Sequence, residues 1–561
     1  MTIKKEIEKL VTSVVNKEYP LFHGREKEGT VIVIEQPKEI SHGDYATNVA
    51  LVLSKKVGKN PMEIAQKIAG NIKNKMFEKI EVAPPGFINF YLAKEIFIEN
   101  VKEVLKKKNE YGKNSPSPRL RRAKKVIIEY TDPNILKEFH IGHLMSNAIG
   151  ESLSRIFEFN EAKIKRFCYQ SDVGLSIAKA IFGKIKKPDL SWQQAYVLGT
   201  KMYEEGENAK KEVADLNKKI FERSDNEINK IYDEGKKWSL EYFGKIYEKL
   251  GTKFDYFIFE SQVANEGKKI VEKNSGKVFE KGDNGAIIFK GENVGLHTRV
   301  FINSEGLPTY EAKELALAEV KYKKYKYANS VVVTANEQTE YFKVVIAAMK
   351  QVFPGLAEKI VHIGHGMMRL PEGKMSSRTG KVVTAEFLID EVEKKIQEKI
   401  GQRNVPAADL EKIAVGALKY SILKQSIGSD IIYDFEKSIS FEGDSGPYLQ
   451  YSFARANSVL QKAKAEKIKA SLKNPASVSQ LEKMMVYFPE VVAKAGKEYE
   501  PHIIVLYLTE LAREFNNYYA NNKIVDKADE FSPYKVALAE AFSTIMKNGL
   551  WLLGISAPEK M

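Results

Sequence analysis

The pattern of hydrophobic and polar positions divides the chain into three regions of different character. Residues 1–112 combine amphipathic helices with a strand at Phe87–Leu92 in which side chains of different polarity alternate. Residues 126–384 alternate short β-branched runs with helical periodicity, and residues 385–561 are almost wholly helical in pattern. We therefore expect an N-terminal α+β domain, an α/β domain with a doubly wound, Rossmann-like parallel sheet, and a C-terminal all-α bundle.

Two segments interrupt this plan. Residues 113–125, rich in Ser, Pro, Arg and Lys, are typical of a linker. Residues from about 175 to 280 are Lys/Glu-rich and mostly helical, so we interpret them as an insertion in the α/β region. The strands expected in the sheet are Val126–Tyr130, Ile164–Tyr169, Gly285–Phe289, Thr298–Ile302, Ser330–Thr334 and Lys359–Ile363, with helices at 144–158, 309–320 and 339–351 between them. Other expected helices include Tyr45–Lys55 and Val478–Lys494.

The stretch from Val126 to Ile156 carries the strongest local signal. Val126–Tyr130 predicts a buried strand, and Pro133 ends it because proline has no N–H to donate to a neighbouring strand. Apolar residues at helical spacing begin at Leu144, so we expect a helix from that residue or just before it. A strand, a polar turn and a helix N-terminus together form a phosphate-binding arrangement.

The tetrapeptide His-Ile-Gly-His occurs twice, at His140–His143 (the first copy) and His362–His365 (the second copy), and uses four of the eight histidines. The first copy lies between a strand and a helix, beside Asn134 and Lys137. The second copy ends an expected strand and is soon followed by Pro371, so no helix starts directly after it. We assign phosphate chemistry to the first copy and sheet structure to the second. For an isolated motif, a capped helix with two polar histidines would be the better interpretation.

A distant segment favours the chemical interpretation. Gly373–Lys381 holds three cations and three hydroxyls between glycines. Such a loop suits closure over a polyphosphate and stabilisation of a departing pyrophosphate. Alone, it would more often be a basic surface turn.

Composition narrows the class of protein. A chain of 561 residues is too long for one hydrophobic core, and it has no run of the roughly 18 apolar residues that a membrane span needs. Its amphipathic start lacks an apolar signal core, so we expect a cytoplasmic location and no membrane association. Cys168 is the single cysteine, which excludes intrachain disulfides and a Cys-rich zinc site. The formal net charge of +14 raises the expectation of nucleic-acid binding modestly.

Together these motifs resemble a class I aminoacyl-tRNA synthetase, and more narrowly the arginyl-tRNA synthetase family. The first copy resembles the histidine signature of the class, and Lys374–Arg378 its lysine-serine loop. The resemblance covers nearly the whole chain, with further matches at Glu129–His143, Gly306–Tyr310, Gly443–Tyr451 and Leu553–Met561. Gly86–Asn89 is similar to part of the extra domain that this family uses to contact the tRNA elbow.

The resemblance implies ATP-dependent ligation of L-arginine to its tRNA through arginyl-adenylate, by a monomer that takes Mg²⁺ with ATP and holds no metal itself. It assigns catalysis to His140, His143, Lys374, Arg378 and Lys137, and ATP binding to His140, Gly142, His143, Lys374, Met375 and Ser376. Arginine would contact Glu129, Asn134, His140, Tyr310, Glu314 and Gln338. The tRNA would contact Phe87, Asn89, Tyr451, Tyr519 and Met561, by stacking on and hydrogen-bonding unpaired bases.

Three departures and several alternatives remain. Family members commonly carry Asp where this chain has Glu314, and Ser377 replaces the second lysine of the class loop, whose charge Arg378 or Lys137 would supply. The segment Asn336–Thr339 is the third departure from the family pattern, so Glu337 is an alternative to Gln338. Strand 87–92 could be a half-buried edge strand, and the tyrosines of the bundle could be core residues. Competing functions are a class I synthetase for another amino acid, an inactive tRNA-binding paralogue, and a small-molecule adenylyltransferase, which would not need the helical bundle.

Overall fold

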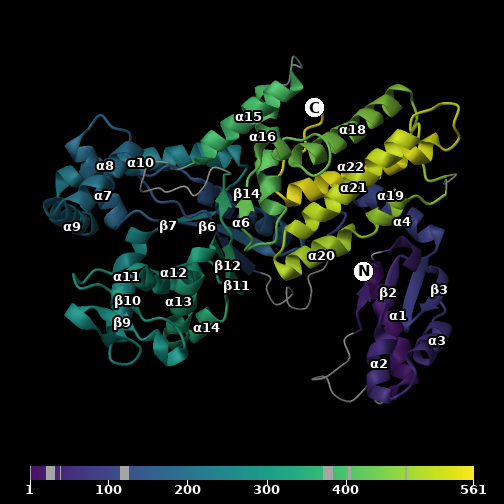
Figure 1. The fold of residues 1–561 in the computed structure, drawn as a ribbon, viewed down its shortest axis with the longest axis horizontal. Coiled ribbons are helices and arrows are strands. Elements are labelled where there is room, and N and C mark those ends of the chain that lie inside the picture. The colour runs from purple at the N-terminus through teal and green to yellow at the C-terminus, as the bar shows by residue number, and fades with distance from the viewer. Residues whose placement is uncertain are drawn as a thin grey trace.

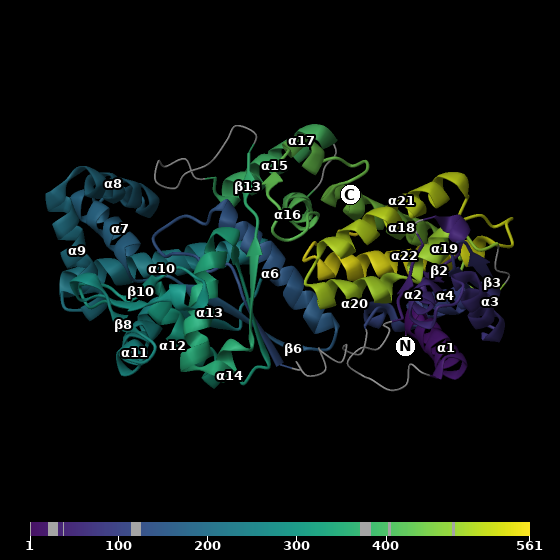
Figure 2. The same cartoon turned by 60° about the horizontal axis from the view of Figure 1, so that its bottom comes forward.

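A computed structural model describes residues 2–20, 32–37, 39–113, 125–370, 383–401, 406–473 and 477–561. Three bodies follow one another along the chain (Figure 1). The N-terminal domain lies beside the C-terminal helical bundle, the helical insertion lies at the other end of the molecule, and the parallel sheet lies between them (Figures 1 and 2). No helix among these residues is both long enough and apolar enough to cross a bilayer.

The N-terminal domain is a four-stranded antiparallel sheet of order β1-β2-β4-β3, packed with helices. Its elements are α1 (Ile3–Glu18), β1 (Ile34–Glu35), η2 (Ile40–His42), β2 (Tyr45–Thr47), α2 (Val49–Val57), α3 (Pro61–Asn71), β3 (Phe77–Ala83), β4 (Phe87–Leu92), α4 (Lys94–Lys107) and η3 (Lys108–Glu110). The predicted helix Tyr45–Lys55 is therefore wrong in its first part. Tyr45 and Thr47 bury their side chains and pair with Phe90 and Ile88 of β4, so the helix begins only at Val49.

The expectation that Asn89 is exposed is also wrong. β4 is an inner strand, in which Asn89 pairs with Ala46 on one side and Glu81 on the other, and its side chain is 4% exposed. Phe87, at the open end of the same strand, is 38% exposed.

The central domain contains the expected parallel sheet, with strand order β12-β11-β5-β6-β7. Its elements are β5 (Lys125–Glu129), α6 (Ile141–Phe159), β6 (Lys163–Gln170), β7 (Tyr256–Phe259), α11 (Glu260–Lys273), α12 (Tyr310–Lys324), β11 (Asn329–Ala335), η6 (Asn336–Gln338), α13 (Thr339–Val352), α14 (Pro354–Ala357) and β12 (Ile360–His365). β5 lies in the middle, where the strand order changes direction. In such sheets ligands bind beyond the carboxyl ends of the strands at this point.

The boundaries of the insertion differ from those expected. Helices α7 (Leu175–Lys186), α8 (Trp192–Glu205), α9 (Glu207–Glu222) and α10 (Asn226–Lys249) form it, and the chain then returns to the sheet as β7. The strands expected at Gly285–Phe289 and Thr298–Ile302 do not join the parallel sheet. They form a separate antiparallel sheet of β8 (Glu280–Lys281), β9 (Ile287–Phe289) and β10 (Arg299–Ile302), with η4 (Asp283–Gly285) and η5 (Gly291–Val294).

The last region is the expected helical bundle. Its helices are α15 (Ala385–Ile400), α16 (Ala407–Leu423), α17 (Phe435–Ser438), α18 (Gly446–Ala465), α19 (Gln480–Met485), α20 (Phe488–Glu498), α21 (His502–Asn521) and α22 (Ser532–Leu552), and the short strands β13 (Met368–Arg369) and β14 (Ile431–Ile432) pair beside it. The single helix predicted at Val478–Lys494 is two helices. The second begins at Phe488 with Pro489 in its first turn, a position where the missing proline N–H costs little.

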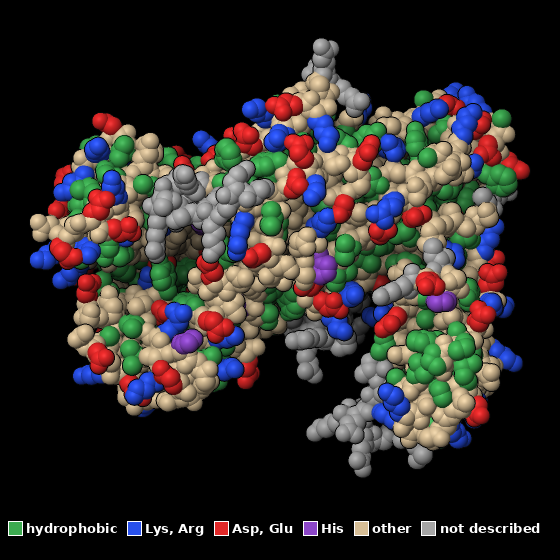
Figure 3. All heavy atoms as spheres, in the orientation of Figure 1, with side chains coloured by type: hydrophobic (Ala, Val, Ile, Leu, Met, Phe, Trp, Pro, Cys, Tyr) green, Lys and Arg blue, Asp and Glu red, His purple; other side chains and the backbone are tan. Residues whose placement is uncertain are grey.

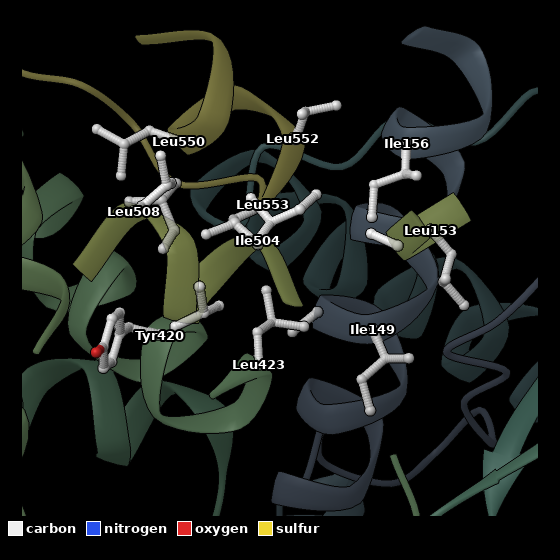
Figure 4. Packing of buried hydrophobic residues seen from close by; sticks show 14 of the residues in the cluster. Ile149, Leu153, Ile156, Tyr420, Leu423, Ile504, Leu508, Leu550, Leu552 and Leu553 are labelled. Carbon is white, nitrogen blue, oxygen red and sulfur yellow. The ribbon is translucent and has the colours of Figure 1, made fainter. Parts of the chain in front are cut away.

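Helix α6 joins the sheet to the bundle. Almost every side chain from His143 to Ser154 is buried, as expected of a helix covered on all sides. Helix α6 packs against α16, α20 and α22. Figure 4 shows Ile149, Leu153 and Ile156 of α6 in the same buried cluster as the bundle residues Tyr420, Leu423, Ile504, Leu508, Leu550, Leu552 and Leu553. The N-terminus of α6 is therefore held firmly at the edge of the sheet.

Candidate active site

The turn between β5 and α6 brings polar groups to the carboxyl edge of the sheet. Thr131 and Asp132 have positive φ angles of 82° and 42°, so the chain reverses sharply after the strand. The Asp132 carboxylate accepts a hydrogen bond from the Tyr169 N–H at 2.7 Å, and Asn134 forms an isolated parallel bridge with Ser171. These contacts fix the turn to the end of β6 beside it.

The first copy caps α6 with its own imidazoles. His140 Nδ1 accepts from the Gly142 N–H at 3.1 Å, and His143 Nδ1 accepts from the His140 N–H at 3.2 Å. The two rings stack with centroids 3.6 Å apart. The helix therefore begins three residues before Leu144, where the sequence placed its start. Because Nδ1 accepts in both rings, the proton of each neutral imidazole is on Nε2 and can be donated to a ligand.

Both histidines are held in this neutral form. Burial lowers the pKa of His140 to about 4, with a smaller contribution from the Lys137 ammonium. Burial also lowers the pKa of His143 well below its ordinary value, followed by the effects of His140 and Lys137. The Nζ atom of Lys137 lies 4.2 Å from the centroid of the Tyr196 ring, which comes from α8 of the insertion. The edge thus presents two N–H donors and one cation, a set suited to phosphate oxygens.

The segment after the lysine-serine loop reaches the first copy directly. The Ile141 N–H donates to the Val383 carbonyl at 3.1 Å, and the Ala385 N–H donates to the Phe139 carbonyl at 2.8 Å. Lys374, Met375, Ser376 and Arg378 themselves lie outside the described residues. The chain that follows the loop therefore lies against the first copy, where Thr384 also bridges to His140.

One face of the sheet beside this turn is acidic. Glu129 lies opposite Phe167 of β6 and Val332 of β11, and its carboxylate pairs with the Lys321 ammonium at 3.0 Å. Both side chains are 2% exposed. Burial, and then the Glu129 charge, raise the pKa of Glu314 to about 8. The same two causes raise the pKa of Asp132 well above its ordinary value.

The remaining arginine candidates surround this acidic face. Tyr310 opens α12, one turn before Glu314, and is 51% exposed, while Gln338 is exposed beyond the end of β11. Tyr169 is two positions beyond Phe167 on β6, so its side chain points to the same face as Glu129. Its buried hydroxyl has no hydrogen-bond partner in the part of the chain that the structure describes. No motif or spacing in the sequence pointed to Tyr169.

The second copy is sheet structure, as predicted. It forms the end of β12, where His362 Nε2 lies 2.8 Å from the Thr334 hydroxyl and its ring stacks 4.2 Å from Phe342. His365 is 1% exposed, and its Nδ1–H donates to the Gly366 carbonyl at 2.7 Å.

Three of the expected tRNA contacts gather in the C-terminal bundle. Tyr451 and Met561 line a hollow of about 520 Å³ together with Arg455 and Asn516. The Arg455 guanidinium lies 4.7 Å from the Tyr451 ring centroid and 5.2 Å from that of Tyr519, which is 43% exposed. The bundle therefore offers aromatic faces around a cation, an arrangement that suits stacking of unpaired bases.

Comparison with known proteins decides the family. Residues 100–435 match the family described as tRNA synthetases class I (R), catalytic domain; residues 449–561 match the DALR anticodon binding domain, and residues 1–92 the arginyl tRNA synthetase N terminal domain. The chain belongs to the arginyl-tRNA synthetase family. The parallel sheet, the N-terminal domain and the helical bundle expected from sequence are the three parts of this family's architecture.

Individual members of the family agree over the full length. Arginine–tRNA ligase of Clostridium perfringens is 31% identical over 94% of this chain and 96% of its own length, and that of Clostridium acetobutylicum is 30% identical over the whole of both chains. Arginyl-tRNA synthetases of Thermus thermophilus and Plasmodium falciparum share the fold, with TM-scores of 0.78 and 0.79 at 23% identity over the whole of both chains.

Proposed function

We propose that this chain ligates L-arginine to its tRNA in two steps at the carboxyl edge of the parallel sheet. The arginine carboxylate attacks the α-phosphate of ATP, forming arginyl-adenylate and releasing pyrophosphate. A ribose hydroxyl at the tRNA terminus then attacks the acyl carbon, and AMP leaves. The observation that carries this proposal is the contact of two unlike surfaces at one turn, a phosphate-binding helix N-terminus and an acidic face.

The helix N-terminus receives ATP. We assign the Nε2–H groups of His140 and His143 to the phosphates, where fixed donors stabilise the charge that develops on the leaving oxygens. Gly142 leaves room for the adenine ring against the backbone. Lys137 adds a cation, and Lys374, Met375, Ser376 and Arg378 are assigned to the loop that covers the nucleotide. Mg²⁺ would arrive with ATP, since Mg²⁺ is commonly bound through substrate phosphates.

The acidic face receives the guanidinium of arginine. A guanidinium is a rigid fork of donors and is best met by carboxylates with neutral acceptors. We assign the carboxylates to Glu129 and Glu314. The other proposed contacts of arginine are Asn134, His140, Tyr310 and Gln338. Lys321 already neutralises Glu129 in the structure, so Glu314 is the less compensated carboxylate. Because its pKa is about 8, arginine binding near neutral pH should release a proton from Glu314. The unpartnered hydroxyl of Tyr169 would accept a further hydrogen bond from the ligand.

The tRNA is proposed to span the molecule. Tyr451, Tyr519 and Met561 would contact anticodon bases in the hollow of the bundle. Phe87 would contact a base from the N-terminal domain, where Figure 3 shows exposed hydrophobic side chains gathered on one face. We propose no direct base contact for Asn89, because its side chain is buried; it lies on the same strand as Phe87. We also propose domain limits of 1–112, 113–125, 126–384 and 385–561, a monomer and a cytoplasmic location.

Aminoacylation of total tRNA with purified protein tests this function. We expect charging with arginine, and ATP–pyrophosphate exchange in the presence of tRNA that depends on arginine and not on lysine or glutamate. Dependence on another amino acid would show that the acidic face is read wrongly. Binding of tRNA without charging of any amino acid would show an inactive paralogue instead of an enzyme.

A further inference from the structure

The helical insertion places one tyrosine against the ATP half of the site. Tyr196 lies in the middle of α8 and is 7% exposed, and the Lys137 Nζ atom lies 4.2 Å from its ring centroid. Lys137 belongs to the turn that carries the first copy. The pair therefore connects the insertion, for which the sequence suggested no role, to the proposed phosphate-binding groups.

Close backbone contacts fix the position of α8. A Cβ atom at Gly183 of α7 would lie 1.9 Å from the Ala195 carbonyl oxygen, and one at Gly199 would lie 1.9 Å from the Lys179 carbonyl oxygen. Only glycine allows the two helices to approach so closely. The turn itself also contacts α8, since the Glu138 N–H donates to the Gln193 side-chain oxygen at 3.4 Å. Tyr196 is thus held on a rigid support.

The electrostatics show that the Lys137 ammonium acts on both neighbours. Burial alone would raise the pKa of Tyr196, yet the Lys137 ammonium, with smaller contributions from hydrogen bonds, lowers it. Burial is the larger cause of the lowered pKa of His140, and the Lys137 ammonium lowers this pKa further. An aromatic face attracts an ammonium most strongly where water is excluded, and it restricts an otherwise flexible four-carbon chain.

We propose that Tyr196 is a positioning residue whose ring holds the Lys137 ammonium beside the first copy, ready to meet the phosphates of ATP. This inference rests on the proposed function, because it needs ATP at the first copy. It gives the insertion a part in adenylate formation. It also gives Lys137 a fixed place from which to supply the charge of the second loop lysine, where this chain has Ser377.

A double-mutant cycle on the full chain tests the inference. The assay is ATP–pyrophosphate exchange with arginine and tRNA present. Tyr196→Leu should lower kcat/KM for ATP about tenfold, as expected for loss of a desolvated cation–ring contact. In a Lys137→Met background the same substitution should cost less than about twofold, since the two side chains act through one contact. Tyr196→Phe keeps the aromatic ring and should therefore retain most of the activity. KM for arginine should change little in each of these variants.

The chain offers a matched control on the same helix. Lys179 Nζ lies 4.0 Å from the ring centroid of Tyr203, so Tyr203→Leu removes a similar cation–ring pair about two turns further along α8 without removing the ring that contacts Lys137. It should leave exchange unchanged. Tyr196→Met serves as a second variant that fills the volume without a ring, should Tyr196→Leu not fold.

Two results would overturn the inference. One is an equal loss from Tyr196→Leu in both the Lys137 and the Lys137→Met backgrounds, which would mean that the tyrosine acts through the fold alone. The other is normal kcat/KM for ATP in a folded Tyr196→Leu or Tyr196→Met protein. Failure of the proposed function would look different, since the unmodified chain would then show no arginine-dependent exchange.

Discussion

The two copies of His-Ile-Gly-His have the same sequence but different secondary structure and different hydrogen bonds. In the first copy, the Nδ1 atoms of His140 and His143 accept backbone N–H groups, so both Nε2–H groups are available. In the second copy, His365 Nδ1–H donates to a backbone carbonyl, and His362 Nε2 is engaged by the Thr334 hydroxyl. Each ring has one nitrogen engaged within the fold, but the first copy leaves an N–H donor on both rings, whereas the N–H of His365 is donated to the Gly366 carbonyl.

Neighbouring residues create this difference. Before the first copy the strand ends in a turn with positive φ angles, and a helix follows at once. The second copy continues a strand that pairs residue by residue with β11. Burial lowers the pKa values in both copies, so a lowered histidine pKa alone does not identify an active site. Which ring nitrogen remains free is the better guide.

Replacing one histidine in each copy should give the largest difference. We expect His143→Ala to slow ATP–pyrophosphate exchange by at least about a hundredfold, because a fixed donor to the developing charge is lost. His362→Ala should leave exchange within about threefold but lower the free energy of unfolding by about 1–3 kcal/mol, through lost stacking and a lost hydrogen bond.

Exchange kinetics and urea denaturation of the same two preparations make the measurement. Normal exchange by a folded His143→Ala protein would reverse the assignment of the copies. A His362→Ala protein that is fully stable yet inactive would do the same.

The sequence predicted the different structures of the two copies, but not all of the elements around them. β5, β6, β11 and β12 were predictable because each is a β-branched or aromatic run between clear turn signals. The start of α6 was expected at Leu144 or just before it and lies at Ile141; it could not be placed more closely, since histidine is not among the usual N-cap residues. β7 was missed because four residues inside a long helical stretch carry too weak a periodic signal.

The buried partners of the site could be predicted only in part. Lys313 pairs with the buried Glu260 carboxylate, as Lys321 pairs with Glu129. The two lysines lie about two turns apart on α12, on either side of buried Leu317, so their place on an apolar face was a usable signal for buried ion pairs. Tyr169 and Tyr196 were not predictable, because their partners come from distant elements and no local spacing connects them. The sequence therefore indicated the polar groups that lie close together in the turn before α6. It did not indicate Tyr169 and Tyr196, whose contacts form only through the tertiary fold.

The central glycines of the two copies should separate function from packing, with an intermediate effect. A Cβ at Gly142 would meet only the His140 ring, at 3.0 Å, whereas a Cβ at Gly364 would lie 2.7 Å from the Thr339 hydroxyl and 3.2 Å from the Asn336 backbone. Gly142→Ala should therefore raise KM for ATP about tenfold with little loss of stability, since the new methyl group occupies the space assigned to adenine. Gly364→Ala should cost about 1–3 kcal/mol of unfolding free energy by overpacking, with KM unchanged.

Thermal or urea unfolding and ATP titrations of both alanine variants check this pair. A raised KM for ATP in Gly364→Ala, with normal KM in Gly142→Ala, would exchange the roles of the two copies.

Acid should affect the second copy through stability and not through activity, and this is the smallest of the expected effects. Burial, and then His365, lower the pKa of His362 from 6.5 to about 4, so the folded state binds fewer protons than the unfolded chain below pH 6.5. The contribution of neutral His362 is thus complete above pH 6.5 and is lost as the pH falls toward 4. His362→Phe, which keeps a ring against Phe342, should reduce the drop in unfolding free energy between pH 7.5 and 5 by about 1–2 kcal/mol. Its pyrophosphate exchange should follow the same pH profile as that of the unmodified chain from pH 5.5 to 8, because we assign contact with ATP to the first copy alone. An altered profile would mean that the second copy also acts on the nucleotide.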